Sequence, residues 1–193
     1  ADRDWRSDVC SSDLGEQRIT FESYKTQDTI ACVNVKLNET SLNGFMAIFN
    51  TKVKDIDAKV NGNLKIERLF SKPIFLADLN ANTIQLGKVA LGNLSIKSSL
   101  NEKQNRIDIE GLLNGAANKL NINGYYSLEK NNQRLDVVAT IQNGELDFLN
   151  YPFFAKYVKD VKGTFSGLAH LAGPIKGLTL DGNVHINEIG RAH

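Results

Sequence analysis

Apolar and polar residues alternate along most of this 193-residue chain, and this alternation constrains its fold more than any other feature. Val33, Val35 and Leu37 are separated by polar residues, and the same pattern recurs at Ile107 and Ile109. Because successive side chains of a β-strand point to opposite sides, each such segment has one apolar and one polar face. The pattern is typical of a half-buried antiparallel sheet.

Asn-Gly and Asp-Gly pairs divide the alternating runs at short intervals. These pairs supply the positive φ angles of tight hairpins, and a glycine can also mark a bulge inside a strand. The pairs are Asn43-Gly44, Asn61-Gly62, Asn114-Gly115, Asn123-Gly124, Asn143-Gly144 and Asp181-Gly182. The sequence therefore predicts an all-β antiparallel meander of about 10–13 short strands. Some adjacent pairs could be single bent strands. The expected strands cover residues 18–25, 30–38, 42–50, 53–60, 62–68, 73–79, 83–91, 93–100, 106–113, 119–128, 134–142, 161–172 and 178–187.

Residues 146–159 break the alternation. Phe154, Tyr157 and Val158 recur at helical spacing, and Pro152 suits a first helical turn. We expect one short helix near residues 150–159 that caps the core of the sheet, with a membrane or partner contact as the alternative.

Both ends of the chain resemble fragments of a common sequencing adapter. With codons GAC GTG TGC TCT TCC GAT CT, residues 8–14 are encoded by a DNA word whose reverse complement is AG ATC GGA AGA GCA CAC GTC. With one preceding base, that complement encodes Glu-Ile-Gly-Arg-Ala-His, which is residues 188–193. Residues 1–14 and 188–193 are therefore predicted to be adapter-derived artefacts, with coincidence as the alternative. Residues 15–187 are then one β-rich segment of a longer protein.

Composition excludes several classes of function. The chain has 23 Lys and Arg against 22 Asp and Glu, which lacks the basic excess of a dedicated nucleic-acid binder. Apolar runs such as 137–139 and 153–155 are too short for a membrane helix or a secretory signal. Without the two ends, Cys32 is the one cysteine left, and we expect it to be a small buried apolar residue.

No residue pattern in the sequence points to catalysis. His170 and His185 have no partners at the spacing of a metal site or a catalytic triad, and we expect both at the surface. The glycines of residues 163–167 lack the Lys-Ser/Thr of a phosphate loop. We therefore predict a protein that is not an enzyme, with no catalytic residue, no metal site and no cofactor.

The glycine pattern of residues 146–186 carries a resemblance to a known family. It resembles the TamB branch of the AsmA-like superfamily of bridge-like lipid transfer proteins, in which Gly-x-x-x-Gly and Gly-x-x-x-x-Pro-x-Leu-x-Gly patterns recur between short strands. Gly163 and Gly167 match the first pair, and Gly173 and Pro174 lie close to the second, with the proline nearer the glycine than is usual. Residues 84–92 and 120–124 are similar in style, so the resemblance covers residues 80–187.

The resemblance implies a fold, a place and a task. Such proteins are very long, are anchored in the inner membrane of a Gram-negative envelope, and form a curled antiparallel sheet with an elongated apolar groove. They are thought to move phospholipid toward the outer membrane and are linked to outer-membrane protein assembly. The implied partners are phospholipid acyl chains, the outer-membrane assembly machinery and neighbouring β-segments of the same parent chain. The implied location is the periplasm.

Alternation supplies candidates for the lining of such a groove. We expect the apolar residues of the alternating runs to face the lipid, although each would equally fit an ordinary closed core. The candidates are Val35, Leu64, Ile66, Leu94, Ile96, Ile107, Ile109, Leu120, Ile122, Leu135, Val137, Leu180, Val184 and Ile186. The alternative function is a structural or adhesive β-repeat module of a cell-envelope or surface protein, with a closed core.

Overall fold

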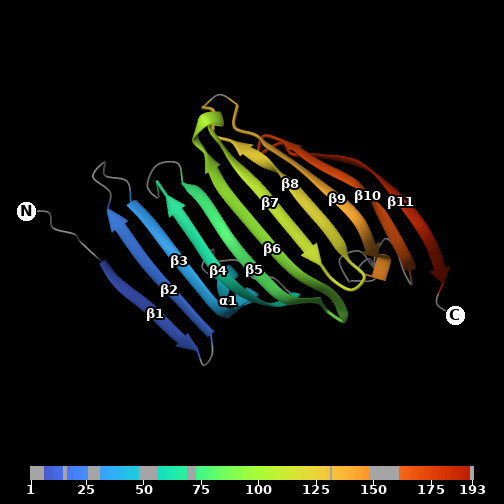
Figure 1. Ribbon diagram of the computed structural model, residues 1–193, viewed down its shortest axis with the longest axis horizontal. Coiled ribbons are helices and arrows are strands. Elements are labelled where there is room, and N and C mark those ends of the chain that lie inside the picture. The colour runs from blue at the N-terminus through green and yellow to red at the C-terminus, as the bar shows by residue number, and fades with distance from the viewer. Residues whose placement is uncertain are drawn as a thin grey trace, which may run out of the picture.

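The computed structural model describes residues 7–14, 17–25, 31–47, 56–68, 73–130, 132–147 and 161–191. Within these ranges, eleven strands form one antiparallel sheet whose spatial order is the order of the strands in the sequence (Figure 1). The elements are β1 (Ser7–Leu14), β2 (Gln17–Lys25), β3 (Ala31–Ser41), α1 (Leu42–Ala47), β4 (Ile56–Glu67), β5 (Ile74–Leu86), β6 (Val89–Asn101), the 3₁₀ turn η1 (Glu102–Gln104), β7 (Arg106–Asn114), β8 (Lys119–Ser127), β9 (Leu135–Glu145), β10 (Val161–Gly173) and β11 (Thr179–Arg191).

The predicted all-β antiparallel meander is confirmed. Figure 1 shows a long twisted sheet with β1 at one end and β11 at the other. These two strands are the edges of the sheet, so it is open and does not close into a barrel. The arrangement is consistent with the expected elongated groove, whose long direction would run across the strands.

The strand predicted at residues 42–50 is wrong over residues 42–47, where the chain forms helix α1, and its last three residues lie outside the described ranges. The backbone N–H of Gly44 donates to Oγ of Ser41 at 3.0 Å. Ser41 directly precedes the helix, so its side chain acts as an N-cap for the first turn. Leu42 and Phe45 of α1 pack against the core. Over so short a segment, the spacing of the apolar residues is compatible with a helix as well as with a strand.

The boundaries between the predicted strands also change. The strands expected at 53–60 and 62–68 form the single strand β4, whereas the strand expected at 83–91 is interrupted by a turn at Gly87 and Lys88. Asn61-Gly62 lies inside β4 and forms no hairpin. Instead, Oδ1 of Asn61 accepts from the backbone N–H of Glu39 at 2.8 Å, where β3 has a bulge.

The pair at 114–115 lies at a chain reversal: Asn114 ends β7, and the N–H of Gly115 donates to the carbonyl of Asn118 at 2.7 Å in the connection to β8. The pairs at 123–124, 143–144 and 181–182 lie inside strands, and the pair at 43–44 lies in α1. The glycines of these four pairs therefore serve the geometry of the strands and the helix and not chain reversal.

Two further predictions concern residues 150–159 and the two ends of the chain. The helix expected near residues 150–159 lies outside the described residues. The ends predicted to be adapter-derived contribute β1 and the last residues of β11 to the sheet. Pairing of a strand does not reveal the origin of its residues, so the division at 14 and 188 stays a prediction.

The most buried part of the sheet lies on β3 and β4. Val35, Leu37, Val60, Leu64 and Ile66 form a cluster in which every member is at most 9% exposed. Two residues of α1 pack against this cluster, so the helix covers one end of the sheet's apolar side.

Candidate functional site

Strand register places all fourteen predicted lining residues on the same side of the sheet. Directly opposed residues of an antiparallel pair point to the same face. Val35 lies opposite Leu64, and Val137 is connected to Leu180 through Leu171, which lies opposite both. Following the register across the sheet defines what we call the apolar face: Val35, Leu64, Ile66, Leu94, Ile96, Ile107, Ile109, Leu120, Ile122, Leu135, Val137, Leu180, Val184 and Ile186.

The cover over the apolar face decreases from β3 toward β11. Val35, Leu64, Ile66 and Ile107 are buried, and the seven candidates from Leu94 to Val137 other than Ile107 are half-buried. On β11, the exposed fraction reaches 72% for Leu180. Val184 and Ile186 on the same strand are also exposed. The face is therefore closed beneath α1 and open at the other edge.

Glycines occupy many of the remaining positions on the apolar face. Gly111 lies opposite both Ile96 and Ile122, and a Cβ added to it would lie 3.2 Å from Cβ of Ile122. The register gives the same side to Gly62, Gly92, Gly124, Gly144, Gly167 and Gly182. Large apolar side chains and glycines are therefore interspersed on the apolar face. Glycines within strands allow a sheet to bend.

The opposite side of the sheet, which we call the polar face, carries charged and amide side chains. One row across neighbouring strands runs Lys36, Asn63, Asp78, Lys97 and Glu110, each opposite the next. Positive and negative groups are interspersed in this row, which favours a solvated surface.

The two histidines differ in their surroundings. His185 is exposed on the polar face, and Nε2 of His170 lies 2.9 Å from Oδ1 of Asp136. Nδ1 of His170 lies 3.8 Å from Oδ1 of Asp181, so the imidazole connects β9, β10 and β11. Over the residues that the structure describes, no three His, Cys, Asp or Glu side chains gather as metal ligands. Cys32 is buried as predicted, and burial raises the pKa of its thiol.

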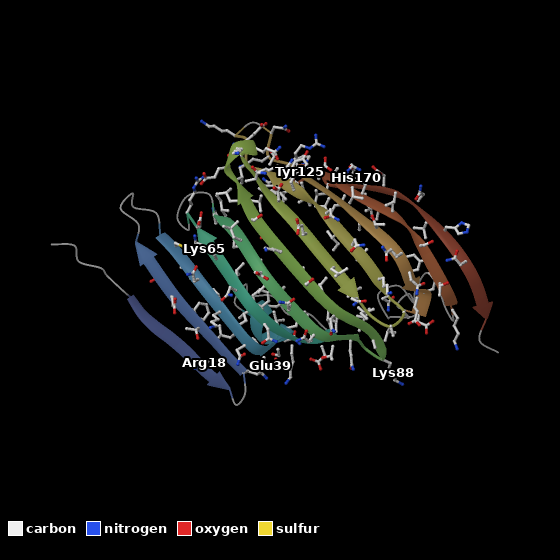
Figure 2. The ribbon with its side chains drawn as sticks, in the orientation of Figure 1. Arg18, Glu39, Lys65, Lys88, Tyr125 and His170 are labelled. Carbon is white, nitrogen blue, oxygen red and sulfur yellow. The ribbon has the colours of Figure 1, made fainter. Side chains whose placement is uncertain are left out.

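Sequence reasoning missed one feature, a hollow of about 490 Å³ at the end of the sheet where β6 to β9 meet their connecting loops. Figure 2 shows Tyr125, one of its lining residues, at this upper end of the sheet, and Lys88 at the opposite end. We call the upper end the upper rim. The lining comes from two connections and the strand ends beside them: Lys103, Gln104 and Asn105 between β6 and β7, Arg106, Tyr125 and Ser127 on β7 and β8, and Glu129, Asn132 and Arg134 between β8 and β9. The pairing of β7 with β8 and a backbone hydrogen bond between Leu128 and Asn105 bring the two connections together. No local sequence signal marks such a meeting.

None of the helices that the structure describes has the length and apolar character of a membrane-spanning helix.

The chain was also compared with known proteins. Comparison with protein-family models, with curated proteins and with solved structures finds no match to this chain.

Proposed function

We propose that this chain is a non-catalytic segment of a longer cell-envelope protein and that its apolar face conducts phospholipid acyl chains across the strands. The proposed setting is the periplasm, as part of an inner-membrane-anchored protein of the TamB-like kind that supports outer-membrane biogenesis. The glycine and alternation pattern of residues 80–187 is the basis for that setting.

The observation that carries the proposal is the continuity of the apolar face. Its fourteen residues are distributed over strands from β3 to β11. At a strand spacing of about 4.8 Å, the nine strands from β3 to β11 span roughly 40 Å, and the six strands from β6 to β11, beyond the cover of α1, span roughly 25 Å. Each length exceeds one bilayer leaflet. A path of this length suits a molecule that moves along the sheet.

Transfer of hydrocarbon out of water supplies the driving force for such binding. Each buried CH₂ of a lipid chain contributes about 0.8 kcal/mol, so a chain of ~16 carbons that crosses water faces a cost on the order of 12 kcal/mol. The half-buried side chains of Ile109, Ile122 and Val137 offer apolar contacts that replace water along the way.

The rival function, a structural or adhesive module, requires a closed core. The described residues form one sheet with a six-residue helix over β3 and β4, and no second sheet covers the apolar face within those ranges. The exposed part of the apolar face, at Leu180, Val184 and Ile186, supports the conducting function over the rival.

Photo-crosslinking tests the proposal. A photoreactive residue placed at Ile109, Ile122 or Val137 should capture phospholipid when the protein is expressed in a Gram-negative envelope. The matched controls are Glu110 and Asn121, which lie on the same strands, β7 and β8, and on the polar face.

Capture confined to the three apolar positions supports conduction. Equal capture at the controls, or no lipid at any position, contradicts it and favours the structural module.

A further inference from the structure

The hollow at the upper rim has a cationic lining. Lys103, Arg106 and Arg134 contribute to it, and Glu129 is the acidic residue among those that line it. The walls are held together by backbone bonds, because the N–H of Leu128 donates to the carbonyl of Asn105 at 2.9 Å. A second hollow of about 460 Å³ shares Asn132 and Arg134 with the first, so Arg134 lies between the two.

The guanidinium groups of Arg106 and Arg134 each contact an aspartate and still have N–H donors available for a ligand. Nε of Arg106 donates to Oδ1 of Asp108 at 2.6 Å, and its Cζ lies 4.6 Å from the centroid of the Tyr125 ring. An arginine has five N–H donors, so this single bond leaves others for a ligand. Nη2 of Arg134 reaches Oδ2 of Asp136 at a long 3.5 Å.

Arg134 also carries an unsatisfied donor. Its Nε atom is buried and has no hydrogen-bond partner among the described residues. A buried donor without a partner is unfavourable, so an acceptor that reached it would stabilise the site. Two fixed guanidinium forks beside one hollow match the geometry of a tetrahedral oxyanion better than that of a lone carboxylate.

The hollow lies at the strand ends, on the polar-face side of the sheet and across the rim from the proposed lipid path. Arg106 begins β7, and the following residue, Ile107, points to the apolar face. On the neighbouring strand, Tyr125 lines the hollow while Tyr126 lies opposite Ile107. Arg106, Tyr125 and Ser127 themselves point to the polar face, so a phospholipid with its headgroup in the hollow would pass around the ends of β7 and β8 to place its acyl chains on the apolar face.

We propose that the hollow lined by Arg106 and Arg134 binds a phosphate group and holds the headgroup of a phospholipid whose acyl chains lie on the apolar face. This inference rests on the proposed function, since it specifies where the headgroup sits. A phosphate could come from a lipid or from free inorganic phosphate, and the experiment separates the two sources.

The test is a titration of the full chain followed by NMR. Dihexanoyl phosphatidylglycerol, inorganic phosphate and octanol are added separately. Backbone amides of Asn105 and Leu128 report on the hollow, and methyl groups of Ile109 and Ile122 report on the apolar face. We expect the phospholipid to shift both sets of signals and octanol to shift the methyl groups alone.

Charge-matched variants identify the residues responsible. In Arg106→Gln/Arg134→Gln, phospholipid affinity should fall roughly tenfold or more because charge-assisted hydrogen bonds are lost, while octanol affinity stays unchanged. The control Lys88→Gln/Lys119→Gln removes two charges at the opposite rim and should bind phospholipid as the wild type does. Arg106→Lys/Arg134→Lys keeps the charge and should recover only part of the affinity.

Each outcome bears on one claim. Wild-type affinity in the Arg106→Gln/Arg134→Gln variant, or an equal loss in the opposite-rim control, overturns the headgroup site. If octanol and phospholipid both leave the isoleucine methyl groups unmoved, the conducting function fails. If, in that case, inorganic phosphate still shifts the amide signals of Asn105 and Leu128, the hollow binds phosphate but not lipid. Circular dichroism of every variant shows whether the sheet is intact.

Discussion

Gly62 is a position where a single missing Cβ decides whether two strands can approach. It lies on the apolar face between Leu37 and Leu79, with a φ of 127° that side chains rarely adopt. A Cβ there would lie 3.0 Å from Cα of Leu79. The strain should therefore combine an unfavourable backbone with a clash inside the most buried part of the sheet.

We expect Gly62→Ala to lower the free energy of unfolding by about 1–3 kcal/mol, measured from urea titration curves. Gly177→Ala serves as the control, because its added Cβ would meet only Cγ of Pro174, at 3.6 Å. Equal stability of the two variants would show that the backbone at Gly62 relaxes without cost.

Two half-buried carboxylates are each held by an asparagine on the polar face or at its edge. The side-chain amide of Asn101 donates to Asp108 at 2.9 Å and, together with Arg106, lowers the pKa of that carboxyl. The amide of Asn61 donates to Glu39 at 2.8 Å and, with Lys59, lowers the pKa of Glu39. A lowered pKa stabilises the fold above the ordinary carboxyl pKa and loses that contribution as pH falls through the lowered value.

Asn101→Ala should therefore raise the pKa of Asp108 toward its ordinary value and leave that of Glu39 unchanged. Side-chain ¹³C titration by NMR measures both groups in the same sample. A Glu39 titration that moved with Asp108 would point to a general change in the sheet and contradict the local cause.

At the residue scale, alternation predicted the face of every lining residue because the two-residue period depends on the strand alone. The partner of Asn61 was not predictable, since it lies 22 residues away across a bulge. Arg106 and Arg134 were missed for the same reason, because the register of β7 with β8 and a backbone hydrogen bond between distant residues bring their loops together.

Among the elements, α1 is the one that changes what the apolar face can bind. Leu42 and Phe45 cover the cluster on β3 and β4, so lipid should reach the sheet from β6 onward and not beneath the helix. Sequence pattern could not reveal this cover, because Leu42 and Phe45 have apolar spacing compatible with the strand predicted at 42–50. The N-cap at Ser41 decides in favour of the helix.

Truncation of the helix side chain should uncover the cluster. Phe45→Ala is expected to reduce stability by on the order of 1–2 kcal/mol, less than a fully buried phenylalanine would, since Phe45 is half-buried. Octanol binding should at the same time extend to the methyl groups of Val35 and Leu64. Phe45→Leu, which keeps apolar bulk, should show neither effect, and an unchanged octanol footprint in Phe45→Ala would contradict the covering role.

At the scale of the whole molecule, β11 forms one edge of the sheet within the part of the chain that the structure describes. Leu180, Val184 and Ile186 are exposed there, and edge strands of this length are templates for pairing with another chain. Concentration-dependent association of the isolated chain should follow from this edge.

Leu180→Lys/Val184→Lys should weaken the association of chains through β11 roughly tenfold or more, because each variant chain would carry two charges on the contact surface. Asn183→Lys/His185→Lys changes the same strand on its polar face and should associate as the wild type does. Sedimentation velocity over a range of concentrations measures the difference. A wild-type chain that stays monomeric throughout, or an equal effect of the two pairs, argues against association through this surface.

Strand order in this sheet equals chain order, and this has a consequence for synthesis. Every strand pairs with the one translated just before it, so each new hairpin needs contacts of short sequence separation only. As the polypeptide leaves the ribosome, the strand at the edge of the partly formed sheet is already the pairing partner of the next strand to be synthesised. Assembly can therefore keep pace with translation, one hairpin after another.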